Sequence, residues 1–143
     1  MRLTADWLEA RTTRTVLGLL TGAGHQAWIV GGAVRDALLG RAVSDLDIAT
    51  DARPETVVSL AEASGLNVVP TGIAHGTVMV IVGETPFEIT TFRRDVETDG
   101  RRAVVAYAAT IEEDARRRDF TLNALYCGPD GELRDPTGGL ADL

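Results

Sequence analysis

The sequence predicts a single α+β domain in which helices pack mainly on one face of a mixed sheet of about five strands. Three observations lead to this prediction: size, composition and the order of elements. The chain has 143 residues, of which 45% are hydrophobic, enough for one domain with a substantial core. The expected order is helix, strand, helix, strand, helix and then a hairpin, which leaves the other face of the sheet open.

The first third of the chain predicts two helices and a strand. Residues 4–20 carry apolar side chains at helical spacing and are followed by two glycines, which predicts an amphipathic helix. Residues 26–30, which contain the apolar run AWIV at 27–30, predict a buried strand. Residues 33–39 predict a short helix that ends at Gly40, because a residue without Cβ suits the left-handed turn after a helix.

The next segments predict a strand, a helix and another short strand. The strand covers residues 45–50. Pro54 suits the first turn of a helix that ends at Gly65. A short strand over residues 66–69 follows.

Two strands joined by a tight turn form the next predicted unit. The apolar run within residues 75–82 is typical of a central strand covered on both faces. Residues 86–92 alternate in character, so Glu88 and Ile89 belong to opposite faces. The three residues between the runs predict a hairpin loop.

The last third contains shorter and more polar elements. Residues 95–102 are charged and contain Gly100, which predicts a mobile loop. Residues 112–118 predict a short charged helix, and residues 132–134 predict a short strand. Residues 120–126 are compatible with either helix or strand.

Two glycines, Gly31 and Gly32, stand between the first predicted strand and the second predicted helix. A strand that ends in glycines and enters a helix presents N–H groups to an anion, typically phosphate. The motif is neither a dinucleotide fingerprint nor a Walker loop, because neither pattern occurs and the chain has no lysine. The alternative is a tight turn followed by a solvated ion pair between Arg35 and Asp36.

Two carboxylates follow this turn closely. Asp45 and Asp47 are two residues apart, so on a strand both leave from the same face. Mg²⁺ prefers one or two carboxylates together with substrate phosphates, so the combination predicts Mg²⁺ between protein and triphosphate, as in nucleotidyl transfer. Glu88 offers a third carboxylate on a strand that can lie beside the pair. The alternatives are a solvated acidic turn for the pair and an ordinary exposed residue for Glu88.

All 14 basic residues are arginines. The run of three at 116–118 needs a counter-charge, and a triphosphate supplies one. The arginine pairs at 93–94 and 101–102 are typical of solvated loop charges. Asp114 is expected to be an exposed charge on a helix face.

Composition also bounds the partners and the compartment. The net charge of −7 argues against a tight, independent RNA-binding module. No apolar segment has the length of a membrane helix, no signal peptide is recognisable, and the lone Cys127 excludes an internal disulfide. These features predict a cytoplasmic protein without a membrane partner. His25 and His75 lack zinc-pair spacing and are expected to be structural.

Together the segments closely resemble the tRNA nucleotidyltransferase and poly(A) polymerase family, whose CCA-adding members belong to the polymerase β-like nucleotidyltransferase superfamily. The resemblance implies the catalytic head fold of that superfamily over residues 1–143, with an N-terminal helix in residues 1–25. The matching motifs run in the family's order: GGAVRD at 31–36, DLD at 45–47, HGT at 75–77, EITTFRRD at 88–95, DGRR at 99–102, RRDFTLNA at 117–124 and DPTGG at 135–139.

The resemblance implies a catalytic role for three carboxylates. Asp45 and Asp47 would bind the catalytic Mg²⁺. Glu88 would be the third acidic group, near the attacking 3′-hydroxyl.

The resemblance also implies a nucleotide site. Gly32, Arg35 and Arg118 would contact the triphosphate. Gly31 would shape the turn, and Asp119 would position an arginine or the ribose.

A further segment resembles the flexible loop that family members use to switch between CTP and ATP. It covers residues 95–102 and contains Asp95, Arg101 and Arg102, with Arg93 beside it.

The family's helical neck carries a Glu-Asp-x-x-Arg motif that pairs with the incoming base, and this motif does not occur before Leu143. Neck, body and tail are therefore expected to be absent. The implied function is Mg²⁺-dependent transfer of CMP and AMP from CTP and ATP to the 3′ end of tRNA, helped by a separate neck and body chain. The alternatives are the nucleotide-binding head of a split or regulatory protein and a poly(A) polymerase, without independent CCA-adding activity.

Overall fold

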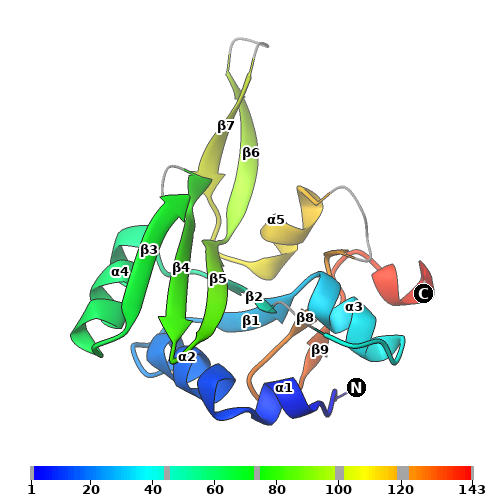
Figure 1. The fold of residues 1–143 in the computed structure, drawn as a ribbon. Coiled ribbons are helices and arrows are strands. Elements are labelled where there is room, and N and C mark those ends of the chain that lie inside the picture. Colours follow the sequence, from blue (N-terminus) through cyan, green and yellow to red (C-terminus); the bar gives the residue numbers. More distant parts are fainter. Residues whose placement is uncertain (1, 44–45, 73–74, 99–101, 119–122, 143) are drawn as a thin grey trace.

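The computed structural model describes residues 2–43, 46–72, 75–98, 102–118 and 123–142, and within them seven strands form one mixed sheet while two more form a separate hairpin (Figure 1). The strands are β1 (Ala27–Val30), β2 (Leu46–Thr50), β3 (Asn67–Gly72), β4 (Thr77–Val82), β5 (Thr85–Thr91), β6 (Arg93–Thr98), β7 (Arg102–Tyr107), β8 (Tyr126–Cys127) and β9 (Leu133–Arg134). The helices are α1 (Asp6–Glu9), α2 (Arg11–Thr21), α3 (Gly32–Leu38), α4 (Pro54–Ala63) and α5 (Ile111–Arg116), followed by a final 3₁₀ turn (Gly139–Asp142).

The strand order of the sheet is β3-β4-β5-β2-β1-β8-β9. β2 and β5 are parallel, and the other neighbouring pairs are antiparallel. Parallel strands need a crossover connection, and α4, β3 and β4 supply it. The α+β class is confirmed, but the sheet is larger than the expected five strands. β8 and β9 extend it beyond β1, and Tyr126, whose segment is compatible with helix or strand by sequence, begins β8.

Alternation along the strands separates the two faces of the sheet. One face packs against α1, α2 and α4 and forms the main core, so the helices lie mainly on one face as expected. This core includes Leu8, Val16, Leu17, Ile29, Ile48, Val57, Val80, Phe87 and Ile89. On the other face α5 covers a smaller cluster that includes Val30, Ala49, Phe92, Ile111, Ala115 and Tyr126. The remainder of that face stays open.

The predicted helix over residues 4–20 is in fact two helices. The backbone of Ala10 is extended (φ −57°, ψ 140°), so the chain turns between α1 and α2. The turn lets Leu8 and Val16 reach the same core, with exposed fractions of 1% and 0%. No described helix has the length and apolar character required to cross a bilayer.

β4 is not covered on both faces as predicted. Val78, Val80 and Val82 are buried, whereas Met79 and Ile81 are only partly buried. The helices cover one side of this part of the sheet, and the continuous apolar run conceals the resulting alternation.

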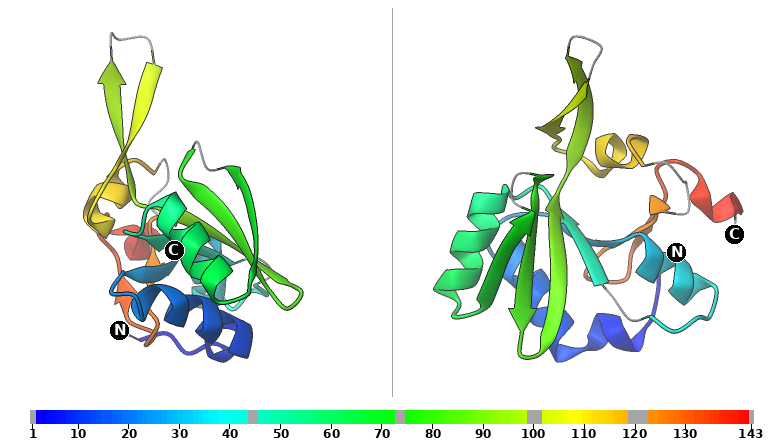
Figure 2. Two further views of the ribbon diagram at one scale, coloured as in Figure 1. Left: turned by 90° about the vertical axis from the view of Figure 1, so that its left-hand side faces the viewer. Right: turned by 45° about the horizontal axis from the view of Figure 1, so that its top comes forward.

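The predicted mobile loop over residues 95–102 is also wrong in its described part. β6 and β7 pair antiparallel from Arg93↔Tyr107 to Thr98↔Arg102. Both views in Figure 2 show this hairpin extending away from the sheet, with α5 beside its base. Residues 99–101 lie outside the described part of the chain.

Candidate functional site

Two of the predicted catalytic carboxylates are direct neighbours on the open face of the sheet. In the parallel pair of β2 and β5, Asp47 stands opposite Glu88. Adjacent strands are about 4.8 Å apart, so the two side chains leave the same face side by side. Both are exposed, while Ile48 and Ile89 on the opposite face are buried. Asp45 lies outside the described residues.

A surface pocket surrounds this pair. It is lined by Leu46, Asp47, Met79, Pro86 and Glu88, which come from β2, β4 and β5. No group of three His, Cys, Asp or Glu side chains in the described residues forms a metal site by itself. Two exposed hard carboxylates nevertheless fit Mg²⁺, which completes its coordination with phosphates and water.

The glycine pair forms the turn from β1 into α3. Gly31 has φ +79°, a conformation that side chains rarely adopt, and its N–H donates to the Leu125 carbonyl over 3.1 Å. A Cβ at Gly32 would stand 3.4 Å from Nη2 of Arg35, an ordinary van der Waals contact, so the guanidinium lies directly beside this turn. These glycines bring the backbone and the arginine close together.

Arg35 is held by two polar side chains. Its Nε donates to Oδ1 of Asp36 over 3.1 Å, and its Nη1 donates to Oδ1 of Asn123 over 3.4 Å. The pair with Asp36 is therefore formed, as the alternative interpretation of this motif expected. Asn123 adds a link to the segment that enters β8.

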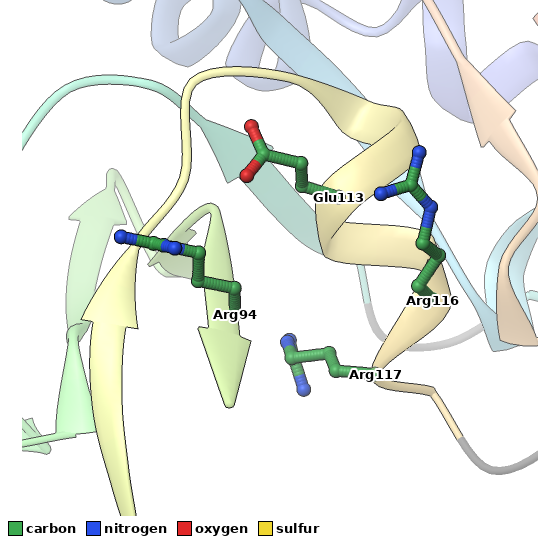
Figure 3. A pocket seen from close by; sticks show the side chains of 4 residues that line it. All are labelled: Arg94, Glu113, Arg116 and Arg117. Atoms are coloured by element: carbon green, nitrogen blue, oxygen red, sulfur yellow. The ribbon is translucent and has the colours of Figure 1, made fainter. Parts of the chain in front are cut away.

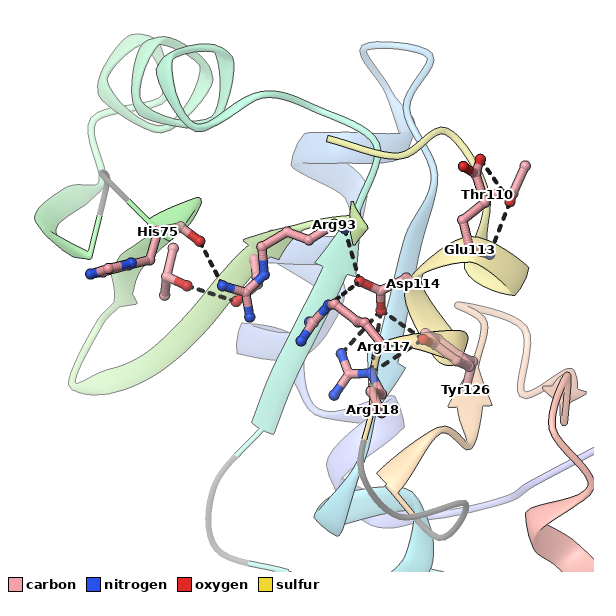
Figure 4. A network of polar contacts seen from close by, with 10 residues as sticks. His75, Arg93, Thr110, Glu113, Asp114, Arg117, Arg118 and Tyr126 are labelled. Carbon is pink, nitrogen blue, oxygen red and sulfur yellow. Dashed lines mark hydrogen bonds and ion pairs between the residues drawn. The ribbon is translucent and has the colours of Figure 1, made fainter. Parts of the chain in front are cut away.

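Asp114 is buried, contrary to the prediction of an exposed helix charge, and it holds several side chains together (Figure 4). Arg117 donates to its Oδ1 through Nε over 3.2 Å, and Arg118 donates to its Oδ2 through Nε and Nη2 over 3.3 and 3.1 Å. The Arg93 backbone N–H donates over 3.0 Å, and the Tyr126 hydroxyl donates over 2.6 Å. One carboxylate thus connects α5, β6 and β8.

The charges in this network shift the acidity of its members. Burial by itself raises the pKa of Asp114, but the Arg118 charge, the Tyr126 hydroxyl and the Arg93 N–H together lower the pKa below its ordinary value. The pKa of Tyr126 is raised, because the ring is buried and the Asp114 carboxylate lies beside its hydroxyl. Asp114 is therefore ionised, and Tyr126 is neutral, at physiological pH.

The sequence contains a pattern from which the buried ion pair of Asp114 could have been predicted. It lies three and four residues before Arg117 and Arg118, the spacing at which helix side chains meet. Ile111 and Ala115, which are apolar and buried, flank it on the same helix. A carboxylate on an apolar face with two arginines in reach indicates a buried ion pair.

The three consecutive arginines separate in space. Arg118 turns inward to Asp114 and Tyr126, whereas Arg116 and Arg117 line a surface pocket with Arg94 and Glu113 (Figure 3). Asp119, the next predicted site residue, lies outside the described part.

The residues of the predicted switching loop are only partly described. Arg93 donates from Nη1 to the His75 carbonyl over 2.9 Å and belongs to β6. Asp95 and Arg102 are strand residues whose side chains are not described, and Arg101 lies outside the described residues.

His25 is placed away from these groups. Its Nδ1 stands 3.3 Å from Oδ1 of Asp51, at the end of β1 opposite the glycine turn. The contact is consistent with the expected structural role.

Comparison with known proteins gives consistent results. Residues 27–143 match the family of the poly A polymerase head domain. The chain is 46% identical to a CCA-adding enzyme of Leuconostoc mesenteroides, covering 100% of this chain and 35% of that enzyme. It is 44% identical to a CCA-adding enzyme of Anoxybacillus flavithermus, covering 94% and 34%. The chain thus spans about a third of the length of these relatives.

Solved structures show the same fold. The Bacillus stearothermophilus CCA-adding enzyme in complex with CTP superposes with a TM-score of 0.81 at 38% identity, over 95% of this chain and 31% of that one. A tRNA nucleotidyltransferase complexed with a primer tRNA and an incoming ATP analogue gives a TM-score of 0.68 at 36% identity, over 89% and 36%. The match covers most of the chain and all the described candidate residues from Gly31 to Arg118, so the chain belongs to the family of the poly A polymerase head domain.

Proposed function

We propose that this chain is the nucleotide-transferring head of an enzyme that adds CMP and AMP from CTP and ATP to the 3′ end of a tRNA. The observation that supports it most directly is the register of β2 and β5, which places Asp47 beside Glu88 on the open face. The CTP, ATP analogue and primer tRNA in complexes of relatives support the substrate class.

In this proposal Asp45 and Asp47 hold Mg²⁺, and Glu88 orients the attacking hydroxyl. Bound Mg²⁺ would lower the pKa of that hydroxyl and stabilise the departing pyrophosphate. The primer 3′-hydroxyl gives up its proton to solvent water, its oxygen forms a bond to the α-phosphorus, and the bond from this phosphorus to the pyrophosphate oxygen breaks. The backbone at Gly31 and Gly32 would approach the triphosphate.

Arg35 and Arg118 supply charge to the triphosphate in this proposal. Asp36 and Asn123 fix the first guanidinium, and Asp114 fixes the second. Asp114 is thus a positioning residue, because its two hydrogen bonds from Arg118 set the direction of the remaining nitrogen, Nη1. Preorganised charge costs no rearrangement when phosphate arrives.

Base selection and the main grip on tRNA belong, in this proposal, to parts of the relatives outside the aligned third. The described residues that address the nucleotide contact only features common to all four nucleoside triphosphates. The proposed reaction and the buried single cysteine, Cys127, agree with action in the cytoplasm.

A chimera tests the proposal. This chain replaces the aligned segment of the Bacillus stearothermophilus enzyme, and transfer of CMP and AMP to tRNA lacking its CCA end is measured with Mg²⁺. We expect activity, and a loss of about a hundredfold or more for Asp47→Asn and Glu88→Gln, since metal and charge stabilisation contributes several kcal/mol. Glu84→Gln, an exposed change in the β4–β5 turn, serves as the control. Full activity of the Asp47→Asn chimera would refute the assignment.

A further inference from the structure

A pocket between α5 and the first strand of the hairpin collects positive charge on an acidic protein. Arg94 comes from β6, and Glu113, Arg116 and Arg117 come from α5 and its C-terminal end (Figure 3). The lining thus contains three guanidinium groups and one carboxylate. The chain as a whole carries a net charge of −7.

Two of these arginines have no acidic partner within the described part of the chain. Among the described residues, no acidic side chain pairs with Arg94 or Arg116, and both are exposed. Glu113, the carboxylate in the lining of this pocket, interacts with Thr110 at the start of α5. Like charges gathered in this way repel one another unless an anion joins them.

The third arginine, Arg117, is held in its orientation by a buried carboxylate. The Nε of Arg117 donates to buried Asp114, and only 16% of the Arg117 side chain is exposed. Figure 3 shows its terminal nitrogens pointing toward Arg94 across the pocket. An arginine fixed at Nε with free terminal nitrogens presents the fork that matches a phosphate.

We propose that the pocket of Arg94, Arg116 and Arg117 binds a phosphate of the RNA backbone close to the primer end. Its lining does not include Arg118, the next residue, which pairs with Asp114 and Tyr126 and which the proposed function assigns to the triphosphate. The inference rests on the proposed function, which requires an RNA strand to reach the open face.

Phosphate contacts hold a strand in place without reading its sequence. No described side chain of the pocket is an amide or an aromatic ring, so guanidinium groups are what it offers to an RNA strand. Guanidinium forks match phosphate, which every nucleotide carries, so we expect binding to depend little on RNA sequence. With so few charges, the pocket contributes a local anchor and not a tight independent grip.

The test measures binding of a short fluorescein-labelled single-stranded RNA to the 143-residue chain by fluorescence anisotropy. The test variant is Arg94→Gln/Arg116→Gln, because removing Arg117 would take a partner away from buried Asp114. Arg2→Gln/Arg11→Gln removes the same charge from exposed positions elsewhere and is the matched control.

We expect the test variant to bind RNA at least about tenfold more weakly, while the control stays within about twofold of the unmodified chain. The slope of log K against log salt should decrease by about 0.7 for each RNA phosphate that the variant no longer binds. Mg²⁺-dependent binding of CTP should be the same in all three proteins.

Three results would overturn the inference. One is an unmodified chain that does not bind the RNA, and another is equal weakening in test and control variants. The third is efficient displacement of the RNA by polyaspartate at equal charge, which would indicate an acidic protein surface as the ligand. In each case intact CTP binding and activity of the chimera would leave the proposed function standing. Loss of both would point to failure of the proposed function itself.

Discussion

The carboxylates on the open side of the sheet fall into two kinds. Asp47 and Glu88 are exposed neighbours held in place by strand register. Asp114 is 1% exposed and accepts hydrogen bonds from side chains and backbone of three elements. A buried carboxylate that accepts several hydrogen bonds organises its surroundings, whereas an exposed carboxylate can be reached by a ligand.

The largest effect on stability is expected at the buried site. Asp114→Ala should lower the free energy of unfolding by about 3–5 kcal/mol, because it leaves buried donors without their acceptor. Urea denaturation followed by tryptophan fluorescence measures it. Glu112→Ala, which breaks an exposed pair with Arg134, should cost less than about 1 kcal/mol. Equal losses in the two variants would remove the distinction between the two kinds of carboxylate.

A second prediction concerns how nucleotides are bound. CTP, ATP, GTP and UTP should bind the 143-residue chain with similar, weak affinities that Mg²⁺ increases. Arg35→Ala and Arg118→Ala should each weaken all four by about 1.5–3 kcal/mol, because each variant lacks one charge-assisted hydrogen bond to phosphate. Titration calorimetry measures the four affinities. About a tenfold preference for CTP and ATP would show that this domain reads the base by itself.

Acid should weaken the buried network as Asp114 becomes protonated. The Asp114 pKa is lowered in the folded chain, so its contribution is present above its ordinary value of 3.8 and is lost as pH falls through the folded value. The stability difference between the unmodified chain and Asp114→Asn should thus shrink on going from about pH 5 to about pH 3. Parallel urea titrations check this. A difference that grows on acidification would contradict the sign.

The smallest change in stability is expected at the exposed pair. Asp47→Asn should alter the free energy of unfolding by less than about 0.5 kcal/mol, as surface substitutions usually do. The same variant should lose the strengthening of CTP binding by Mg²⁺. A large loss of stability would show that Asp47 supports the fold.

Much of the fold could be predicted from local periodicity. Alternation in residues 86–92 assigned Glu88 to the open face and Ile89 to the core, since a strand with one solvated face must alternate. The end of the short helix at Gly40 could be predicted in the same way, and the structure gives φ +73° at this glycine.

Other features depended on contacts that a local pattern does not contain. The β6–β7 hairpin has no apolar stripe in residues 95–98, so this charged segment resembles a loop until it is paired with the partner strand β7. Asp114 resembles any helix carboxylate until Tyr126 and the Arg93 N–H, distant in sequence, are placed against it. The pairing of Asp47 with Glu88 needed the parallel register itself, because the two residues are separated by a helix and two strands.

The register between β2 and β5 limits which insertions and deletions the domain can accept. The distance between Asp47 and Glu88 is fixed by main-chain hydrogen bonds of β2 and β5, and not by the path of the chain between them. The intervening excursion through α4, β3 and β4 can therefore vary in length at its turns, such as Gly83 and Glu84, without moving the two carboxylates. A shift of β5 by a single residue would turn Glu88 into the core and abolish the pair. The loops of the domain can thus accept insertions and deletions, whereas the carboxylate pair requires that β2 and β5 keep their register.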